Sequence, residues 1–107
     1  MDLRAKRCVP CEGGTPPMTE EEQRALLPQV PGWKVEAGRL VKTFVFESFP
    51  QAIAFVNRMA DLAEEEGHHP DFCVHYREVK VSLWTFAIGG LSENDFILAA
   101  KIDGLLA

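Results

Sequence analysis

The chain has 107 residues, of which 47% are hydrophobic and 25% are charged, and its formal net charge is -5. This length fits one domain that buries a core without disulfides, and the acidic balance argues against a nucleic-acid-binding surface, which would need a basic patch. No apolar stretch is long enough to span a bilayer and none forms a signal-peptide core, so we expect a cytoplasmic protein with no membrane partner.

The N-terminal part of the sequence is rich in Pro, Gly and Cys. We therefore expect an irregular leader over residues 1–17 and a single domain over residues 18–107. Cys8 and Cys11 have the spacing of a redox pair or of half a zinc site, but no second Cys or His pair lies nearby to complete four ligands. We therefore favour an incidental position of Cys8 and Cys11 in the leader over a metal-binding or redox role, and we predict no metal site.

Capping signals and turn residues mark the first half of the domain. Thr19 and Glu22 form a capping box for a short helix that runs to Leu27. Strands are expected over residues 33–36 and 39–46, joined by a turn at Ala37-Gly38.

The second half repeats this arrangement with longer elements. Ser48 is the N-cap of a long helix that ends before Gly67. Its apolar residues recur at helical spacing, so we expect one buried face, made by Ile53, Val56, Met59, Ala60 and Ala63, with Phe55 and Leu62 widening it. Strands follow over residues 72–76 and 79–86. Ser92 and Asp95 form a second capping box, and a final amphipathic helix runs to Leu105.

The predicted order is αββαββα. Consecutive hairpins imply an antiparallel sheet, and helices must cover one of its faces to make a core. The expected fold class is therefore α+β, a four-stranded antiparallel sheet with three helices packed on one face.

The segment His68-His69-Pro70 is the most informative in the chain, because imidazole exchanges protons near neutral pH. It follows three glutamates, residues 64–66, at a helix C-terminus, where carboxylates oppose the helix dipole. The acidic run is either a solvated helix end or a source of negative potential that favours a protonated imidazole acting as a general acid. Pro70 restricts His69 to extended conformations, in which adjacent side chains diverge, so metal chelation by the pair is disfavoured.

A longer pattern around these histidines closely resembles the pterin-4a-carbinolamine dehydratase family. The resemblance covers roughly residues 19–105, and the leader also resembles one found in some bacterial and plant members. The matching residues are Glu64-x-x-x-His68-His69-Pro70, Tyr76, Gly90-Leu91-Ser92-Glu93-x-Asp95, Gly32-Trp33 and Phe44-x-Phe46.

The resemblance implies a hydro-lyase that needs no cofactor. Its substrate would be a 4a-hydroxytetrahydropterin, which loses water to give a quinonoid dihydropterin and so supports tetrahydrobiopterin recycling. His68 and His69 would be the catalytic acid–base residues. The residues that would contact the substrate are Glu64, Pro70, Trp33, Phe86 and Asp95. For Asp95 a helix-capping role is the stronger alternative, and Trp33 could instead belong to the core.

Phe86 departs from the family pattern, which usually has a third histidine there, just after a threonine such as Thr85. On a strand, Phe86 would share a face with Trp84, where the two rings could stack on a pterin or form an oligomer contact. The departure leaves an alternative open: a non-catalytic, pterin-binding or protein-interaction member of the family. The family and the two open sheet edges also suggest a homodimer or homotetramer.

Overall fold

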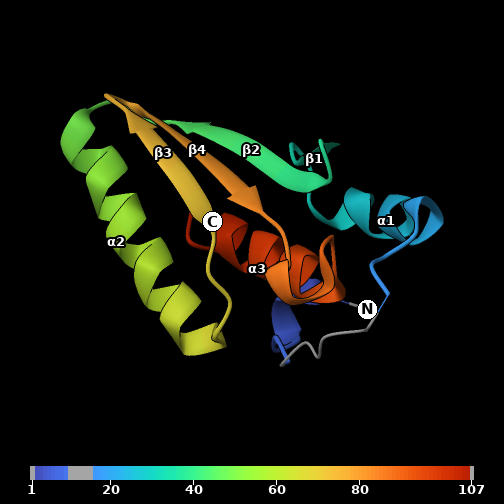
Figure 1. The fold of residues 1–107 in the computed structure, drawn as a ribbon. Coiled ribbons are helices and arrows are strands. Elements are labelled where there is room, and N and C mark those ends of the chain that lie inside the picture. The colour runs from blue at the N-terminus through green and yellow to red at the C-terminus, as the bar shows by residue number, and fades with distance from the viewer. Residues whose placement is uncertain (1, 10–15, 107) are drawn as a thin grey trace.

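The structure, a computed structural model, describes residues 2–9 and 16–106. The predicted αββαββα order and α+β class are confirmed: a four-stranded antiparallel sheet in the order β1-β2-β4-β3 is covered by helices on one face (Figure 1). The main elements are α1 (Glu20–Leu26), β1 (Lys34–Glu36), β2 (Arg39–Val45), α2 (Phe49–Glu66), β3 (Asp71–His75), β4 (Glu78–Leu83) and α3 (Glu93–Gly104). Single 3-10 turns occur at Leu3–Ala5, Leu27–Gln29 and Phe86–Ile88. No helix among the described residues is long and apolar enough to cross a membrane.

The helix ends form where the sequence predicts them. Thr19 and Glu22 make the capping box of α1, and the Ser48 hydroxyl accepts a hydrogen bond from the Gln51 N–H at the start of α2. Gly67 ends α2 in the left-handed conformation, with φ 66°, which glycine adopts without strain. This turn directs the chain from α2 into the histidine pair.

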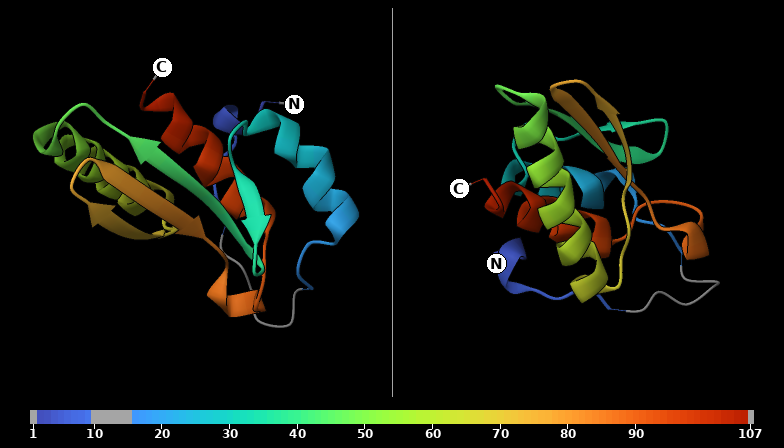
Figure 2. Two further views of the ribbon diagram at one scale, coloured as in Figure 1. Left: turned by 90° about the horizontal axis from the view of Figure 1, so that it is seen from above. Right: turned by 90° about the vertical axis from the view of Figure 1, so that its left-hand side faces the viewer.

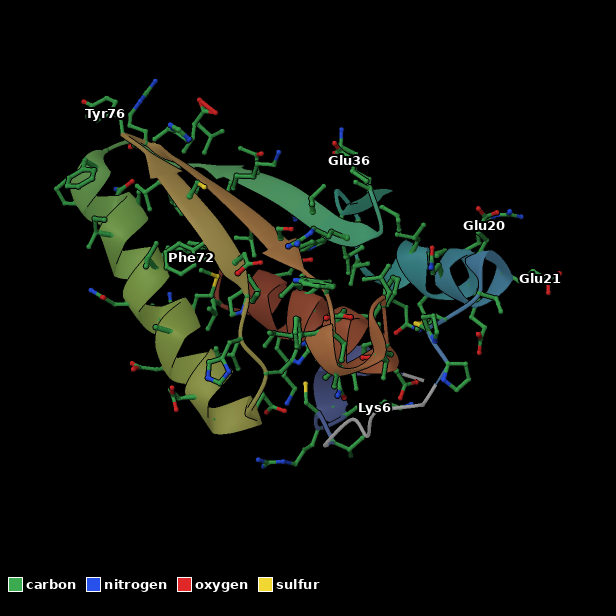
Figure 3. The ribbon with its side chains drawn as sticks, in the orientation of Figure 1. Lys6, Glu20, Glu21, Glu36, Phe72 and Tyr76 are labelled. Atoms are coloured by element: carbon green, nitrogen blue, oxygen red, sulfur yellow. The ribbon has the colours of Figure 1, made fainter. Side chains whose placement is uncertain are left out.

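Two strand ends differ from the prediction. Tyr76 was expected in the third strand, but it lies in the β3–β4 turn with φ 56° and its ring is exposed at the tip of the hairpin (Figure 3). The fourth strand was expected to reach Phe86, but β4 ends at Leu83. The reason is local: the Thr85 N–H donates to the Gly90 carbonyl instead of to a neighbouring strand, which closes a loop over residues 85–90.

The helices bury more surface than amphipathic patterns suggest. The final helix was expected to have one apolar face, but α3 is buried on nearly all sides. The sheet and α2 cover part of it, and the N-terminal segment packs on the remainder (Figure 2). There the Arg4 side chain donates a hydrogen bond to the Ala100 carbonyl. On α2 the buried stripe is rotated from the predicted one, so that Ala52 is buried and Ala60 is exposed.

Part of the predicted leader is integrated into the core. The Leu3 side chain is buried within the main hydrophobic cluster, and the Leu3 N–H donates to the Gln29 side chain. The proposed division at residue 18 remains a prediction, and Cys11 lies outside the described residues. Residues 2–9 nevertheless belong structurally with the domain.

Candidate active site

A cavity of about 510 Å³ lies where the end of α2, the start of β3 and the loop after β4 meet. This volume suits a small-molecule ligand. Both histidines of the central motif line it, together with Thr85 and Phe86 from the 85–90 loop and Val9 from the N-terminal segment. The structure therefore brings three distant parts of the sequence to one site.

His68 is held by a buried carboxylate. Its Nε2 atom lies 2.6 Å from Oδ1 of Asp95, and the imidazole is only 12% exposed while Asp95 is fully buried. A carboxylate only accepts hydrogen bonds, so Nε2 carries the hydrogen. The other ring nitrogen, Nδ1, has no hydrogen-bond partner within residues 2–9 and 16–106. It is therefore free to exchange a proton with a ligand.

Asp95 is fixed by donors on its second oxygen. Oδ2 accepts hydrogen bonds from the Ser92 N–H and from the Thr85 hydroxyl, both at 2.9 Å. Since the single hydroxyl hydrogen of Thr85 is used in this way, Thr85 accepts from the Ser92 hydroxyl at 2.7 Å. The carboxylate thus has three donors, which offset the cost of burying its charge. Asp95 caps α3 as expected, and it orients His68 without lining the cavity.

His69 points to a different partner. Its Nε2 atom lies 3.3 Å from Oε1 of Glu64, and both side chains are largely exposed. The two adjacent rings diverge as expected for extended chain. An imidazolium at His69 would be paired with the Glu64 carboxylate. Pro70 restricts the backbone of His69 where the chain enters β3.

Part of the cavity lining is aromatic. The rings of Trp84 and Phe86 meet edge to face at 5.8 Å, although Phe86 lies in a 3-10 turn and not on the predicted strand face. The Arg39 guanidinium sits 4.5 Å from the Trp84 ring centre and forms a 2.8 Å ion pair with Asp71. Phe86 is 82% exposed, so its ring presents a large apolar surface at the cavity.

Trp33 is not brought to this cavity. It is buried in the core against Phe44, and its Nε1–H donates to the Asp103 carboxylate, which also pairs with Lys42 at 2.9 Å. The core alternative weighed for Trp33 matches this placement. Sequence reasoning missed Val9 and Asn94, because isolated residues in loops and caps follow no periodic pattern, and it placed Thr85 in the fourth strand without a role in the site.

The described residues contain no group of three or more His, Cys, Asp or Glu side chains that could hold a metal ion. Cys8 is half-buried, and burial, followed by the negative charge of Glu66, raises the pKa of its thiol to about 12. A thiol with this pKa is neutral at physiological pH and a poor metal ligand or nucleophile.

Comparison with known proteins gives a consistent result. The model of a family described as pterin 4 alpha carbinolamine dehydratase matches residues 16–105. A protein of Nitrosomonas eutropha is 50% identical over 106 residues, covering 98% of this chain and 94% of its own, and one of Dechloromonas aromatica is 48% identical over 105 residues, with the same coverages. Both are provisionally named pterin-4-alpha-carbinolamine dehydratases.

Two solved structures are also similar. A Brucella melitensis protein described as a transcriptional coactivator/pterin dehydratase superposes with a TM-score of 0.80 at 30% identity, covering 85% of this chain and 99% of its own. A pterin dehydratase-like protein described as a RuBisCO assembly factor in the alpha-carboxysome gives a TM-score of 0.57 at 31% identity, covering 68% of this chain and 84% of its own.

Proposed function

The chain belongs to the pterin-4-alpha-carbinolamine dehydratase family, and on that premise we propose that it removes water from a 4a-hydroxytetrahydropterin by histidine acid–base catalysis. The observation that carries this proposal is the pair of histidines lining one cavity, with the ring of His68 oriented by a buried aspartate. The product would be a quinonoid dihydropterin, and the reaction would support tetrahydrobiopterin recycling.

The proposed reaction needs one proton donor and one proton acceptor. The hydroxyl on C4a leaves as water when an acid protonates it, and a base takes the proton from N5 as the C4a–N5 double bond forms. Neutral His68, with its hydrogen on Nε2 toward Asp95, offers Nδ1 as the base. His69, paired with Glu64, is then the acid. After the reaction His68 carries the N5 proton, and exchange with solvent restores both rings.

The aromatic side of the cavity supports binding of a flat substrate. A pterin is a planar, polar bicycle, and stacking on an aromatic ring supplies affinity without demanding a proton transfer. Trp84 and Phe86 offer such a surface in the cavity that the histidines also line. We propose that Phe86 binds the substrate in place of a third titrating residue, so that catalysis depends on the two remaining histidines.

The test is stopped-flow absorbance with freshly generated 4a-hydroxytetrahydropterin, measured against the rate in buffer alone. His68→Ala should reduce the enzymatic acceleration about 10²–10⁴-fold. His75→Ala is the matched control, because His75 is an exposed histidine on β3 outside the cavity, and it should keep the wild-type rate. Equal rates for wild-type protein and buffer, with the protein folded, would reject a dehydratase.

A second candidate function is binding of a pterin or a protein without turnover. It is favoured by Phe86, which cannot transfer a proton, and by the similar structure described as a RuBisCO assembly factor. Under this alternative the His68→Ala change would leave pterin or protein binding nearly intact. Measured binding of a 7,8-dihydropterin without any acceleration of dehydration would support it.

We also propose that the chain forms a homodimer or homotetramer. Strands β1 and β3 are the two edges of the sheet, and an edge strand presents unpaired backbone groups that a second copy can meet. Phe72 on β3 is 42% exposed and adds apolar surface at that edge (Figure 3). Sedimentation equilibrium of the purified chain would test this, and a monomer at high micromolar concentration would contradict it.

A further inference from the structure

We propose that the N-terminal segment Leu3–Val9 is a wall of the active site and that Asn94 is the positioning residue that holds it there. The inference rests on the proposed function, since it assigns this segment a part in retaining the pterin. It concerns a region that the catalytic histidines do not explain and that sequence patterns assign to an irregular leader.

The segment is anchored along its whole length. Leu3 is buried in the core, and the Arg4 side chain donates to the Ala100 carbonyl at 3.2 Å. The Lys6 ammonium pairs with the Glu93 carboxylate at 2.8 Å. Lys6 lies near the bottom of the molecule in Figure 3. The Cys8 N–H donates to the Glu66 side chain at 2.9 Å. Three polar contacts to α3 and α2, together with the burial of Leu3, therefore hold this segment along the way to the cavity.

Asn94 makes the last attachment with both ends of its amide. Its Oδ1 atom accepts from the Val9 N–H at 2.9 Å, and its Nδ2 atom donates to the Val9 carbonyl at 2.6 Å. The Asn94 residue is only 4% exposed. A buried asparagine that satisfies a single residue's N–H and C=O fixes both the position and the direction of the chain there. Val9 itself lines the cavity and is 64% exposed.

The residue that clamps Val9 by two hydrogen bonds and the residue that orients His68 are adjacent in the sequence. Asn94 and Asp95 lie in the first turn of α3, where one holds Val9 and the other holds His68. Removing the Asn94 amide should release Val9 and open that side of the cavity, while the anchors nearer the N-terminus remain and His68 keeps its carboxylate partner. Substrate retention should then weaken, but the chemical step should not, which is a rise in KM at nearly constant kcat.

The first experiment breaks the clamp from both sides. Asn94→Ala removes the amide, and Val9→Pro removes the backbone donor. Asn94→Ala removes both hydrogen bonds to Val9 and should raise the KM for 4a-hydroxytetrahydropterin about tenfold, whereas Val9→Pro removes only the bond from the Val9 N–H and should raise it less. The double variant should be no worse than Asn94→Ala, because the bond that Val9→Pro removes is already absent there. Asn57→Ala, an exposed asparagine on α2, is the control. Additive effects, or a loss confined to kcat, would overturn the assignment.

A second variant pair does not depend on loosening the fold. Val9→Trp places a large ring at the cavity wall and should raise KM strongly without lowering the melting temperature. Val45→Trp is its matched control, since Val45 is 67% exposed on β2 and lies outside the cavity. A Val9→Trp protein with wild-type KM would show that Val9 does not border the bound substrate, and would refute the proposal.

A third readout separates this inference from the proposed function. Diethyl pyrocarbonate acylates neutral imidazole nitrogens, and its rate at His68 can be followed by peptide mass spectrometry with exposed His75 as internal reference. Release of Val9 in Asn94→Ala should accelerate acylation of His68 severalfold relative to His75. If wild-type protein neither binds nor dehydrates pterins but this acceleration occurs, the proposal that Val9 shields His68 is supported and the proposed dehydratase function is rejected. If the wild-type protein dehydrates the pterin and Asn94→Ala changes neither the KM nor the acylation rate, only the proposal about the N-terminal segment is rejected.

Discussion

Replacing Asp95 with asparagine should invert the hydrogen-bond polarity of His68. The Oδ2 position must stay an oxygen, because it faces the Ser92 backbone N–H and the Thr85 hydroxyl hydrogen. The amide NH₂ of the new side chain therefore takes the Oδ1 position, 2.6 Å from Nε2 of His68. Nε2 must then accept a hydrogen bond, which moves the imidazole hydrogen to Nδ1. The nitrogen proposed to receive the N5 proton is thereby occupied.

The size of the effect follows from these contacts. A base in the wrong tautomer loses most of its contribution, so kcat/KM should fall about 10²–10⁴-fold. Three hydrogen bonds that end on a charge become neutral, and each weakens by about 1 kcal/mol, although a neutral amide is also cheaper to bury. We expect a net loss of about 1–3 kcal/mol in unfolding free energy. The protein should remain folded and inactive.

The assay is stopped-flow dehydration combined with urea unfolding and a nitrogen NMR determination of the His68 tautomer. Asp103→Asn is the control: Asp103 is a carboxylate on the same helix, bonded to Trp33 and Lys42, and it lies outside the cavity. It should lose similar stability but keep its activity. The reasoning is refuted if Asp95→Asn retains kcat/KM within threefold while His68→Ala does not, because His68 would then work without the orientation that Asp95 provides.

Three further predictions concern residues at or near the cavity. Phe86→His should raise kcat/KM at least about tenfold by supplying a third imidazole. Phe86→Leu is the control and should not raise kcat/KM. Equal rates for the two variants would show that the side chain at position 86 contacts the substrate without taking part in proton transfer. Glu66→Gln should cost about 1–3 kcal/mol at pH 7, because it leaves Lys101 without its 2.9 Å partner. Burial alone would raise the pKa of the Glu66 carboxyl, but the Cys8 N–H and Lys101 outweigh burial and lower the pKa below its ordinary 4.5. The stabilisation by Glu66 is therefore present above pH 4.5 and should disappear as the pH falls through the lowered pKa. A difference in unfolding free energy between wild type and Glu66→Gln that does not change with pH would contradict this. Cys8, with its thiol pKa raised to about 12, should be alkylated by iodoacetamide at pH 8 far more slowly than exposed Cys73, as read by peptide mass spectrometry. Equal rates would mean that Cys8 is not held against Glu66 and Asn94 in solution.

The parts of the fold that depend on local chemistry could be predicted from the sequence. The capping residues Thr19, Ser48 and Ser92 and the terminal Gly67 mark helix ends by hydrogen bonds within four residues, so the order of elements follows. What could not be predicted depends on distant partners. The burial of α3 on nearly all sides requires the N-terminal segment, and no periodicity in either stretch indicates that they meet.

The same division applies to the site. The motif identifies His68 and His69, but their different environments come from long-range pairing: His68 meets a residue 27 positions away, while the partner of His69 is only five positions away. Thr85 was expected in the fourth strand, directly before Phe86, and was given no role in the site. Its role arises because the chain leaves the sheet at Leu83 and folds back, which brings its hydroxyl to Asp95. A strand through residue 86 would have kept it in the ladder.

Asp95 shows how a capping residue can also serve chemistry. Weighed from sequence alone, the capping role and the functional role competed for this residue. In the structure the two roles fall on different oxygens: Oδ2 accepts the Ser92 N–H that starts α3, and Oδ1 faces His68. A helix cap needs only the first of these, and a serine or asparagine could also provide it. The second requires a full carboxylate buried beside an imidazole, which is costly unless that ring must be oriented. The arrangement at Oδ1 is therefore best explained by His68, and it is the reason that Asp95→Asn, which preserves the cap, is the most informative substitution in this chain.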